Sequence, residues 1–444
     1  SELTKKIHNK EILNLPDRAY LSRAMSHSET RNHNKIDDKE VTASSIKPYS
    51  EPSPLKKHQQ STPTELCDQL ESRILVGYEW DSPETPVYWE YGHDKLANRH
   101  MIIFGKSGQG KTYCIQGLLM ELAANSVNSL IIDYTDGFLP DYLEEEYIDA
   151  VAPKTHLVAH EPIPINPFRI QKQTVAGIEI QDKPHVIGGR IASVLSSAYS
   201  TMGEQQLPLI IETIEEGVLK HGEKYTFQKL LNDLGEHGKT GEKVASKLGP
   251  LVKTDIFQEN SRNGWADIFN DTNSTTQIIQ LATLSKDIQK LSTEFILWDL
   301  YAHAKNVGNK NKPLPIILDE VQNLDHRLDS PLGKMLTEGR KYGISLILAT
   351  QTLSNLPKDA QDRLFQASYK LFFAPAETEI KKYAEILENT IPNSSRHDWV
   401  NILSTLGKGE CLSVGPHLTQ AGNLEVSVKK VRVPALERRI SAPN

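Results

Sequence analysis

The stretch from Met101 to Ala123, MIIFGKSGQGKTYCIQGLLMELA, constrains the fold of this chain more than any other. Four apolar residues, typical of a buried strand, lead into a glycine-rich turn and then into a helical pattern. The turn fits G-x-x-x-x-G-K-[ST], in which glycines allow backbone N–H groups to face phosphate oxygens at a helix N-terminus. This context favours a nucleotide phosphate site over an ordinary strand-to-helix turn. The residues expected to bind nucleotide are Gly105, Gly108, Gln109, Gly110, Lys111, Thr112 and Tyr113.

Hydrolysis of a bound nucleotide needs further groups beside this turn. Lys111 is expected to reach the β- and γ-phosphates, and the Thr112 hydroxyl is expected to ligate Mg²⁺. The segment PLPIILDEVQNL places Asp319 and Glu320 at the end of an apolar strand. We expect Asp319 to orient Mg²⁺ and Glu320 to polarise the attacking water. The alternative is a helix cap followed by a solvated residue of the first turn, but the phosphate turn upstream favours the catalytic pair.

Composition limits the remaining possibilities. A chain of 444 residues with 38% hydrophobic and 24% charged residues suits a globular protein of two or three domains. Its net charge of -7 gives no general attraction to nucleic acid, so any DNA contact must be a local patch. Three widely separated cysteines indicate neither a disulfide framework nor a zinc site and fit a reducing cytoplasm. No apolar run approaches the ~20 residues of a membrane helix. Because the sequence opens on Ser1 instead of methionine, we expect a processed chain or a part of a longer one.

Strand and helix patterns alternate from Met101 onward, which predicts an α/β fold with a mainly parallel sheet covered by helices on both faces. ECLSVG and LEVSVKKVRV alternate like strands and predict a closing hairpin at the sheet edge. Between PINPF and QIIQLATL, strand character is low and apolar residues recur at helical spacing. The predicted divisions are a disordered arm or linker over 1–61, a helix from Thr62 with short strands over 62–100, the core over 101–170 and 276–444, and a helical insertion over 171–275.

A third apolar strand ends in SLILATQ, where Gln351 follows the strand directly. An amide at a strand end can hydrogen-bond both a phosphate and the attacking water, and so report whether the nucleotide is intact. Considered alone, Gln351 is more typical of a surface turn.

Six segments together resemble the HerA/FtsK superfamily of P-loop ATPases, and in particular its branch of HerA and the conjugation ATPases of VirB4 and TrwB type. They are GKSGQGKT, LIIDYTDG, PINPF, PIILDEVQNL, EGRKYGISLILATQ and LGKGECLSVG. The resemblance covers Arg73 to Val433. It implies a RecA-like core in which the SLILATQ strand lies between the phosphate-loop strand and the strand ending in Asp319. That order would place Gln351 beside the γ-phosphate.

The same resemblance implies a hexameric ring with the nucleotide held between subunits. Arg340 of EGRKYG would then be an arginine finger that reaches the γ-phosphate of the neighbouring subunit, although an isolated arginine there is more typical of a solvated helix. Asp133 and Asp136 match a family position near the active site, and a turn or capping role is equally compatible with them. Asn166 is expected to be structural.

The resemblance implies ATP and Mg²⁺ as cofactors and double-stranded DNA as the polymer moved by a translocase or helicase subunit. We expect a cytoplasmic motor that works with a partner nuclease in DNA restriction, antiviral defence or end processing. The general layout also resembles the C-terminal ATPase module of DptH-type phosphorothioation-dependent restriction proteins. Candidate pore contacts, for which a solvated face is the more typical explanation, are Lys239, Lys243, Lys247, Lys253, Lys305, Lys310 and Lys312.

Two other functions remain open. The first is a VirB4/TrwB-like ATPase of a secretion or conjugation system, which the lack of an apolar membrane segment disfavours. The second is a nucleotide-binding scaffold without turnover, which the combination of Lys111, Glu320 and Arg340 disfavours.

Overall fold

The structure is a computed structural model that describes residues 72–199, 202–203, 205–258, 264–269 and 275–440. The predicted arm over 1–61 and the helix predicted from Thr62 lie outside the described residues. All described residues belong to one compact unit of the chain.

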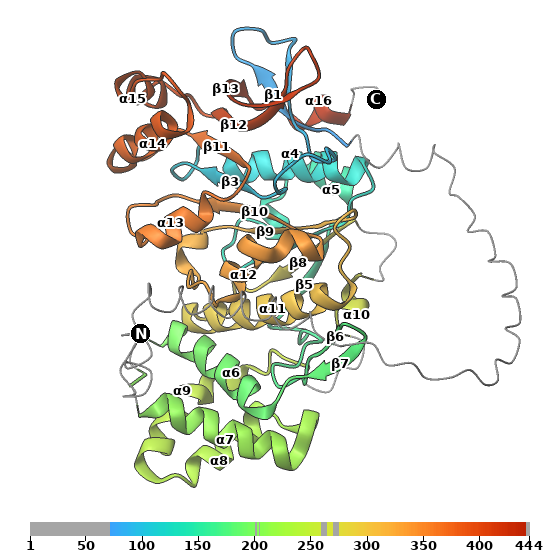
Figure 1. The fold of residues 1–444 in the computed structure, drawn as a ribbon, viewed down its shortest axis with the longest axis vertical. Helices are drawn as coiled ribbons and strands as arrows, with labels where there is room; N and C mark the ends of the chain where they lie inside the picture. The colour runs from blue at the N-terminus through green and yellow to red at the C-terminus, as the bar shows by residue number, and fades with distance from the viewer. Residues whose placement is uncertain (1–71, 200–201, 204, 259–263, 270–274, 441–444) are drawn as a thin grey trace, which may run out of the picture. The chain divides into compact units, whose positions relative to one another are not determined.

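One eleven-stranded sheet runs through this unit in the order β2-β1-β13-β12-β11-β3-β10-β9-β4-β8-β5 (Figure 1). From β11 to β5 neighbouring strands are parallel. These strands are β11 (Tyr369–Phe373), β3 (Met101–Phe104), β10 (Ile344–Thr350), β9 (Leu314–Leu318), β4 (Ser129–Asp133), β8 (Thr276–Gln280) and β5 (Lys154–Leu157). Parallel strands that are buried on both faces consist mostly of consecutive apolar residues, as β3 and β10 do. The predicted α/β fold with a mainly parallel sheet is confirmed.

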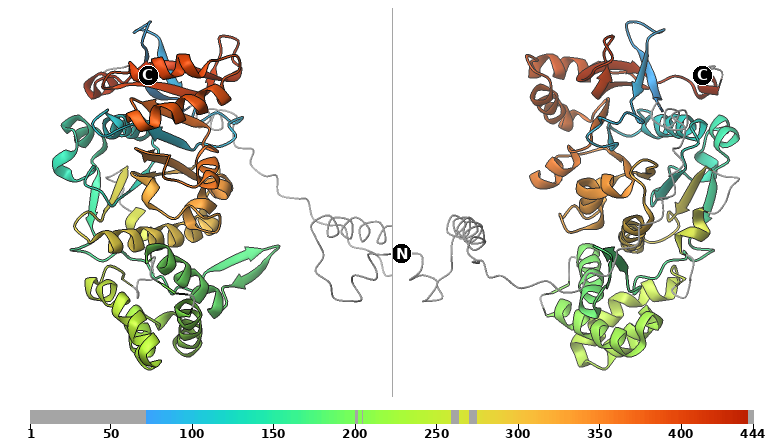
Figure 2. Two further views of the ribbon diagram at one scale, coloured as in Figure 1. Left: turned by 90° about the vertical axis from the view of Figure 1, so that its left-hand side faces the viewer. Right: turned by 45° about the vertical axis from the view of Figure 1, so that its right-hand side comes forward.

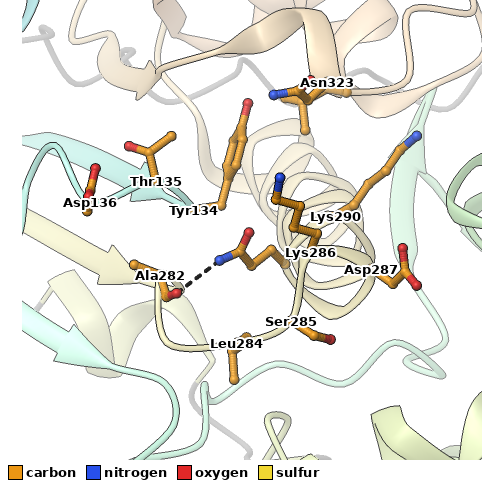
Figure 3. A pocket seen from close by; sticks show the side chains of 12 residues that line it. Tyr134, Thr135, Asp136, Ala282, Leu284, Ser285, Lys286, Asp287, Lys290 and Asn323 are labelled. Atoms are coloured by element: carbon orange, nitrogen blue, oxygen red, sulfur yellow. Dashed lines mark hydrogen bonds between the residues drawn. The ribbon is translucent and has the colours of Figure 1, made fainter.

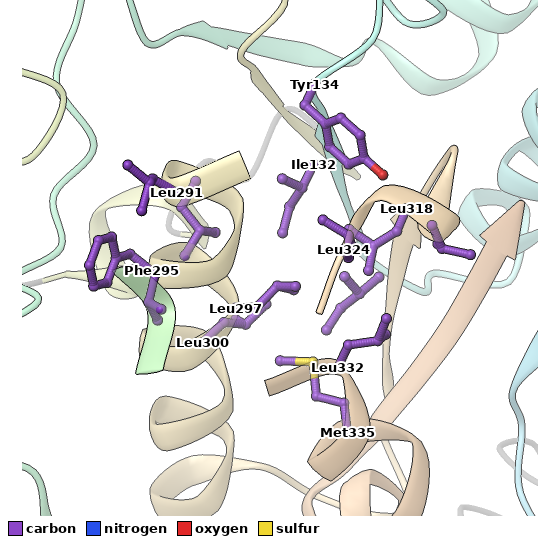
Figure 4. Close-up of a cluster of buried hydrophobic side chains, with 14 of the residues drawn as sticks. Ile132, Tyr134, Leu291, Phe295, Leu297, Leu300, Leu318, Leu324, Leu332 and Met335 are labelled. Carbon is purple, nitrogen blue, oxygen red and sulfur yellow. The ribbon is translucent and has the colours of Figure 1, made fainter. Parts of the chain in front are cut away.

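Helices cover both faces of the parallel strands. One face carries α4 (Lys111–Ala124), α5 (Glu145–Val151) and α16 (Leu436–Ile440), and the other carries α11 (Lys286–Val307), α12 (Pro331–Glu338) and α13 (Lys358–Leu364). Because successive side chains of a strand point to opposite faces, Ile103 joins the α4 cluster and Ile102 the α11 cluster. Figure 4 shows the second cluster, in which Leu297 of α11, Leu318 of β9 and Met335 of α12 gather beside the sheet.

The sheet continues antiparallel beyond β11, through β12 (Glu410–Leu418) and β13 (Leu424–Arg432) to β1 (Ile74–Glu79) and β2 (Pro86–Trp89). The predicted closing hairpin is therefore present, but its predicted place at the edge is wrong, because β1 pairs with the outer side of β13. Gly77 permits this pairing, since a Cβ there would lie 2.4 Å from the carbonyl oxygen of Arg432. The N-terminal strands thus cover an edge that the hairpin would otherwise expose.

The segment between β5 and β8 is largely helical, as its spacing predicted. Its helices are α6 (Pro184–Ala198), α7 (Gln206–His221), α8 (Phe227–Gly235), α9 (Gly238–Thr254) and α10 (Trp265–Phe269). The sequence prediction missed a hairpin of β6 (Lys172–Val175) and β7 (Ile178–Gln181), which projects as a two-stranded ribbon (Figure 2). Its turn places Ala176 and Gly177 at positive φ. The division of the chain into core and insertion at 171 and 275 stays a prediction.

The remaining described elements are 3₁₀ helices and two α-helices. The 3₁₀ helices are η1 (Pro140–Tyr142), η2 (Gly222–Lys224), η3 (Val321–Asn323) and η4 (Gly339–Tyr342), and the α-helices are α14 (Glu377–Thr390) and α15 (Arg396–Ser404). In the part of the chain that the structure describes, no helix combines the length and apolar character needed to cross a membrane.

Candidate functional site

A cavity of about 740 Å³ opens at the carboxyl ends of β3, β4, β9 and β10. Ligands of open parallel sheets commonly bind at this edge, because loops from several strands meet there. The predicted site residues that line the cavity are Gly108, Gly110, Lys111, Thr112, Tyr113, Asp319, Glu320 and Gln351. The fold thus places residues that are more than 200 positions apart in the sequence in the lining of one cavity.

The glycine-rich turn leaves β3 and enters α4 in the conformation that its sequence predicts. Gly108 and Gly110 have φ of 76° and 96°, which L side chains rarely adopt. Lys111 is 7% exposed, and its Nζ donates to the carbonyl oxygens of Gly105 at 2.8 Å and Lys106 at 3.2 Å. Burial lowers the pKa of Lys111, and the charges of Asp319 and Glu320 oppose this shift. The ammonium group therefore lies folded on a loop whose backbone can cradle phosphates.

Thr112 and Asp319 both lie close to Gly137. A Cβ on that glycine would be 3.8 Å from Thr112 Cγ2 and 3.9 Å from Asp319 Oδ2. Burial, reinforced by the charge of Glu320, raises the pKa of Asp319 to about 6. A hydroxyl and a carboxylate in need of a counter-charge fit Mg²⁺, which takes few protein ligands and retains several waters. The described residues contain no cluster of three His, Cys, Asp or Glu side chains that would form an all-protein metal cage.

Glu320 is held by several contacts in a left-handed conformation with φ of 49°. Its N–H donates to Asp319 Oδ1 at 2.8 Å, and its carbonyl oxygen accepts from the Tyr134 hydroxyl at 2.7 Å. Its carboxylate accepts from the side-chain amides of Gln322 and Gln351. A non-glycine residue in this conformation costs about 1–3 kcal/mol and persists where surrounding contacts enforce it, which is common at functional sites.

Gln351 follows β10, which lies between β3 and β9 as the resemblance implied. The loop after it is anchored by α14. Glu379, 3% exposed, accepts from Thr352 Oγ1 at 2.7 Å and from the Leu353 N–H at 2.9 Å. The Tyr383 hydroxyl donates to the Gln351 carbonyl oxygen at 3.3 Å. Sequence reasoning missed Glu379, since nothing in its local pattern distinguishes it from a solvated helix carboxylate.

Arg340 is not brought to the cavity of its own chain. It lies in η4, before β10, whereas the cavity lies after that strand. Its guanidinium is exposed and donates to the Ala97 carbonyl oxygen at 2.7 Å. A contact with nucleotide could therefore come only from another subunit, and this role stays a prediction.

The other polar residues singled out in the sequence have different surroundings. Asp133 organises the following turn, since its carboxylate accepts from the N–H groups of Thr135 and Phe138 and from the side-chain amide of Gln280. Asp136 lines the cavity. Asn166 is structural, as expected: its Oδ1 accepts from the Phe168 N–H at 2.9 Å.

A neighbouring cavity of about 710 Å³ lies between the 134–136 loop, Asn323 and the start of α11 (Figure 3). It shares Thr135 and Asp136 with the first cavity. Lys286 and Lys290 line it together with Asp136 and Asp287, so its formal charges balance. This cavity therefore offers no net attraction for an anion.

The lysines predicted as pore contacts fall into two separate groups. Lys239, Lys243, Lys247 and Lys253 belong to α9 in the helical segment. Lys305 lies near the end of α11, where its Nζ donates to Gln173 Oε1 at 2.9 Å, and Lys310 and Lys312 precede β9. Their role in a pore stays a prediction.

The cavity also contains residues that the sequence did not identify. Lys408 and Gly409, from the loop before β12, line it together with Ser107, Thr135, Gly137, Glu144 and Val433. The Gly409 N–H donates to the Gln109 carbonyl oxygen at 3.1 Å. The segment LGKGE contributed to the family resemblance, but only the folded chain places it against the phosphate loop.

Comparison with solved structures supports this architecture. VirB4 of Thermoanaerobacter pseudethanolicus has a TM-score of 0.63 at 15% identity, with 83% of this chain and 98% of that chain covered. The plasmid coupling protein TrwB bound to a non-hydrolysable ATP analogue has a TM-score of 0.53 at 13% identity, with 76% and 85% covered. At such identities the likeness shows a shared fold, the RecA-like P-loop core.

Sequence comparison identifies the family. The DNA double-strand break repair helicase HerA of Sulfolobus acidocaldarius is 23% identical over 336 residues, which are 72% of this chain and 62% of that protein. The protein of the same name from Sulfurisphaera tokodaii is 23% identical over 342 residues, with 71% and 62% covered. The chain thus spans 62% of the length of these relatives. The model of the family "Helicase HerA, central domain" matches residues 74–300, just over half of the chain, and the chain therefore belongs to this family.

Proposed function

We propose that this chain is an ATPase that couples hydrolysis to movement along double-stranded DNA as a subunit of a homohexameric ring. The observation that carries the proposal is the meeting of Lys111, Asp319, Glu320 and Gln351 around one cavity at the ends of adjacent parallel strands. The names of the sequence relatives, which are DNA repair helicases, support DNA as the polymer.

The residues divide the chemistry among them. Lys111 would leave the carbonyl oxygens of Gly105 and Lys106 for the β- and γ-phosphates, whose acceptor oxygens carry full charge. Thr112 and Asp319 would hold Mg²⁺, which neutralises charge on the transferred phosphoryl group. Glu320 would take up a proton from the attacking water, and Gln351, already bonded to Glu320, would link that water to the γ-phosphate.

A subunit interface would complete the site. The cavity lacks Arg340 in its own chain, while the exposed position of this guanidinium before β10 leaves it available to a neighbouring copy. A cation supplied in trans makes hydrolysis depend on ring assembly, so that subunits can hydrolyse ATP one after another. The pair of cofactors is supported by TrwB, which has also been solved in complex with ADP and Mg²⁺.

The cellular setting belongs to the same proposal. The term double-strand break repair in the names of the relatives supports a role at DNA ends. From the sequence resemblance we further propose a cytoplasmic motor that feeds DNA to a partner nuclease, in end processing or in restriction and antiviral defence of the DptH type. The second candidate is a VirB4/TrwB-like ATPase of a secretion or conjugation system, since this chain shares its fold with 98% of the VirB4 chain; the shared fold alone is compatible with either function.

The test is the rate of ATP hydrolysis by the purified chain with and without double-stranded DNA, with protein-free and Glu320→Gln reactions as controls. A DNA motor predicts strong stimulation by duplex DNA. Weak stimulation favours the secretion or conjugation ATPase. Binding of ATP without turnover under either condition would support a nucleotide-regulated scaffold and overturn the proposal.

A further inference from the structure

The loop of Gly407 to Gly409 closes one side of the candidate nucleotide cavity. Its Gly409 N–H donates to the Gln109 carbonyl oxygen at 3.1 Å, and a Cβ built on Gly110 would lie 3.7 Å from Gly409. Lys408, at the centre of this loop, lines the cavity. The loop that leads into β12 therefore places a second lysine beside the phosphate loop, close to the start of α4.

The position of Lys408 is enforced by its neighbours. The Glu410 carboxylate accepts from the Gly407 N–H at 3.1 Å, from Trp80 Nε1 at 2.7 Å and from the Arg432 guanidinium at 3.0 Å. Gly409 has φ of 78°, a turn conformation that suits glycine. These contacts join Trp80, which follows β1, to β12 and β13, and they fix the loop in position.

The charge of Lys408 has no protein partner in the part of the chain that the structure describes: its side chain is exposed and forms no hydrogen bond or ion pair there. Lys111 is the other lysine that lines the cavity, and no arginine lines it. A nucleoside di- or triphosphate brings several negative charges into this space, and one ammonium group neutralises only part of them. Lys408 thus supplies a cation that the folded chain itself does not use.

The surroundings of Lys408 indicate which part of a nucleotide it meets. Tyr113 and Val433 lie at this end of the cavity: the Val433 N–H donates to the Gly409 carbonyl oxygen, and the Leu436 N–H to the Tyr113 hydroxyl. The residues expected to act in hydrolysis are Asp319, Glu320 and Gln351. They follow β9 and β10, which lie on the other side of β3 from β11 and β12. The backbone N–H groups of such a glycine-rich loop cradle the α- and β-phosphates, and the Lys408 loop contacts this phosphate loop at Gln109. Lys408 is accordingly placed for these phosphates and not for the γ-phosphate.

We propose that Lys408 is a nucleotide-binding residue that contacts the α- or β-phosphate in the same subunit and contributes to affinity instead of to the hydrolytic step. This inference rests on the proposed nucleotide site. An ammonium group is only a donor, so it recognises phosphate oxygens and does not by itself select one base.

The test compares dissociation constants for ADP and ATP by calorimetry in the Glu320→Gln background, so that ATP is not consumed. Lys408→Ala is expected to weaken ADP and ATP equally, by about tenfold, as for one partly hydrated charge-assisted hydrogen bond. Lys408→Arg should retain most of the affinity. The matched control is Lys430→Ala in β13. The Lys430 Nζ lies 3.9 Å from the Trp80 ring centroid, and Lys430 does not line the cavity. This variant should keep the dissociation constants for ADP and ATP within about twofold of the parent values.

In the otherwise wild-type chain, Lys408→Ala should raise the KM for ATP by about the same tenfold factor as the dissociation constant. Unchanged affinity for both nucleotides would overturn the proposal, and so would a loss confined to ATP, which would place Lys408 at the γ-phosphate. A loss shared by Lys430→Ala would assign the effect to the hairpin as a whole and also contradict it. If the parent protein binds neither nucleotide, the proposed function fails and not merely the role of Lys408.

Discussion

Glu320 shows how single residues are prepared for chemistry at this site. Its backbone adopts φ of 49°, its carbonyl oxygen is held by Tyr134, and its carboxylate receives the amides of Gln322 and Gln351. The buried carboxyl group of Asp319 next to it has a pKa raised to about 6. Two acidic groups in contact at a poorly solvated strand end are costly for the unliganded protein, and a bound cation would relieve that cost.

Replacing this base is the first prediction. Glu320→Gln keeps the shape of the side chain and an acceptor oxygen for one of the two amide contacts, but it removes the proton acceptor. ATP should therefore bind while its hydrolysis falls by about 10²–10⁴-fold, as measured by single-turnover kinetics. Lys111→Ala is the contrasting variant, which should lose ATP binding itself. Normal single-turnover rates in Glu320→Gln would show that the water is activated by another group.

At the scale of elements, α11 is connected to the loop after β9 by a buried carboxyl group. Glu294 is 1% exposed, and its Oε1 accepts from the Asp325 N–H at 2.7 Å. Burial raises its pKa to about 8; the charge of Asp325 raises it further, whereas the Asp325 N–H and the charges of Lys290 and Arg327 oppose the shift. Tyr134 also lies close enough to interact electrostatically with Glu294. The folded protein therefore favours the neutral form of Glu294.

This contact predicts a pH-dependent stability. Because the pKa in the folded state lies above the ordinary value of 4.5, the stabilising contribution is complete below that pH and is lost as the pH rises through about 8. The free energy of unfolding of the wild type should thus fall between pH 5 and 8.5 by on the order of 3 kcal/mol relative to Glu294→Gln. Denaturant titrations at a series of pH values measure this difference. The control is Glu377→Gln, which replaces an exposed carboxylate of α14. Its free energy of unfolding should show the same pH dependence as that of the wild type. If the free energy of unfolding of Glu294→Gln also had the pH dependence of the wild type, Glu294 would not be the group responsible.

The elements also show which features a sequence can reveal. The phosphate loop was predicted because its requirements are local: an apolar strand, glycines at positive φ and a helix start within a short stretch. The place of Gln351 required a strand order, which came from the family resemblance. Glu379 and Lys408 were missed because their partners, the 352–354 loop and Gln109, lie far away in the sequence. The edge position of β1 was missed for the same reason, since strand pairing with β13 spans nearly the whole described chain.

At the scale of the whole molecule, the site is incomplete in a single chain if Arg340 acts as proposed. An arginine finger contributes about 10³–10⁵ in rate, since it offsets charge on the transferred phosphoryl oxygens. Arg340→Ala and Lys111→Ala should therefore each be nearly inactive. In an equal mixture that exchanges subunits, up to about one quarter of interfaces would pair a sound phosphate loop with a sound arginine, and ATPase activity should return.

The control for this mixing experiment is Lys341→Ala, which removes a neighbouring exposed charge and should remain active alone. Absence of recovery, although both variants assemble and Arg340→Ala still binds ATP, would assign Arg340 a structural role through its contact with the Ala97 carbonyl oxygen.

Displacement of a third strand from a DNA triplex reports directly whether this chain is an ATP-driven motor on duplex DNA. The purified chain should release the third strand in the presence of ATP and Mg²⁺ at a rate that follows ATP hydrolysis. Glu320→Gln should bind ATP and DNA but release none. Vigorous ATP hydrolysis by the wild type without any strand release, or release that is equal in Glu320→Gln, would contradict the claim that hydrolysis at this cavity moves the protein along DNA.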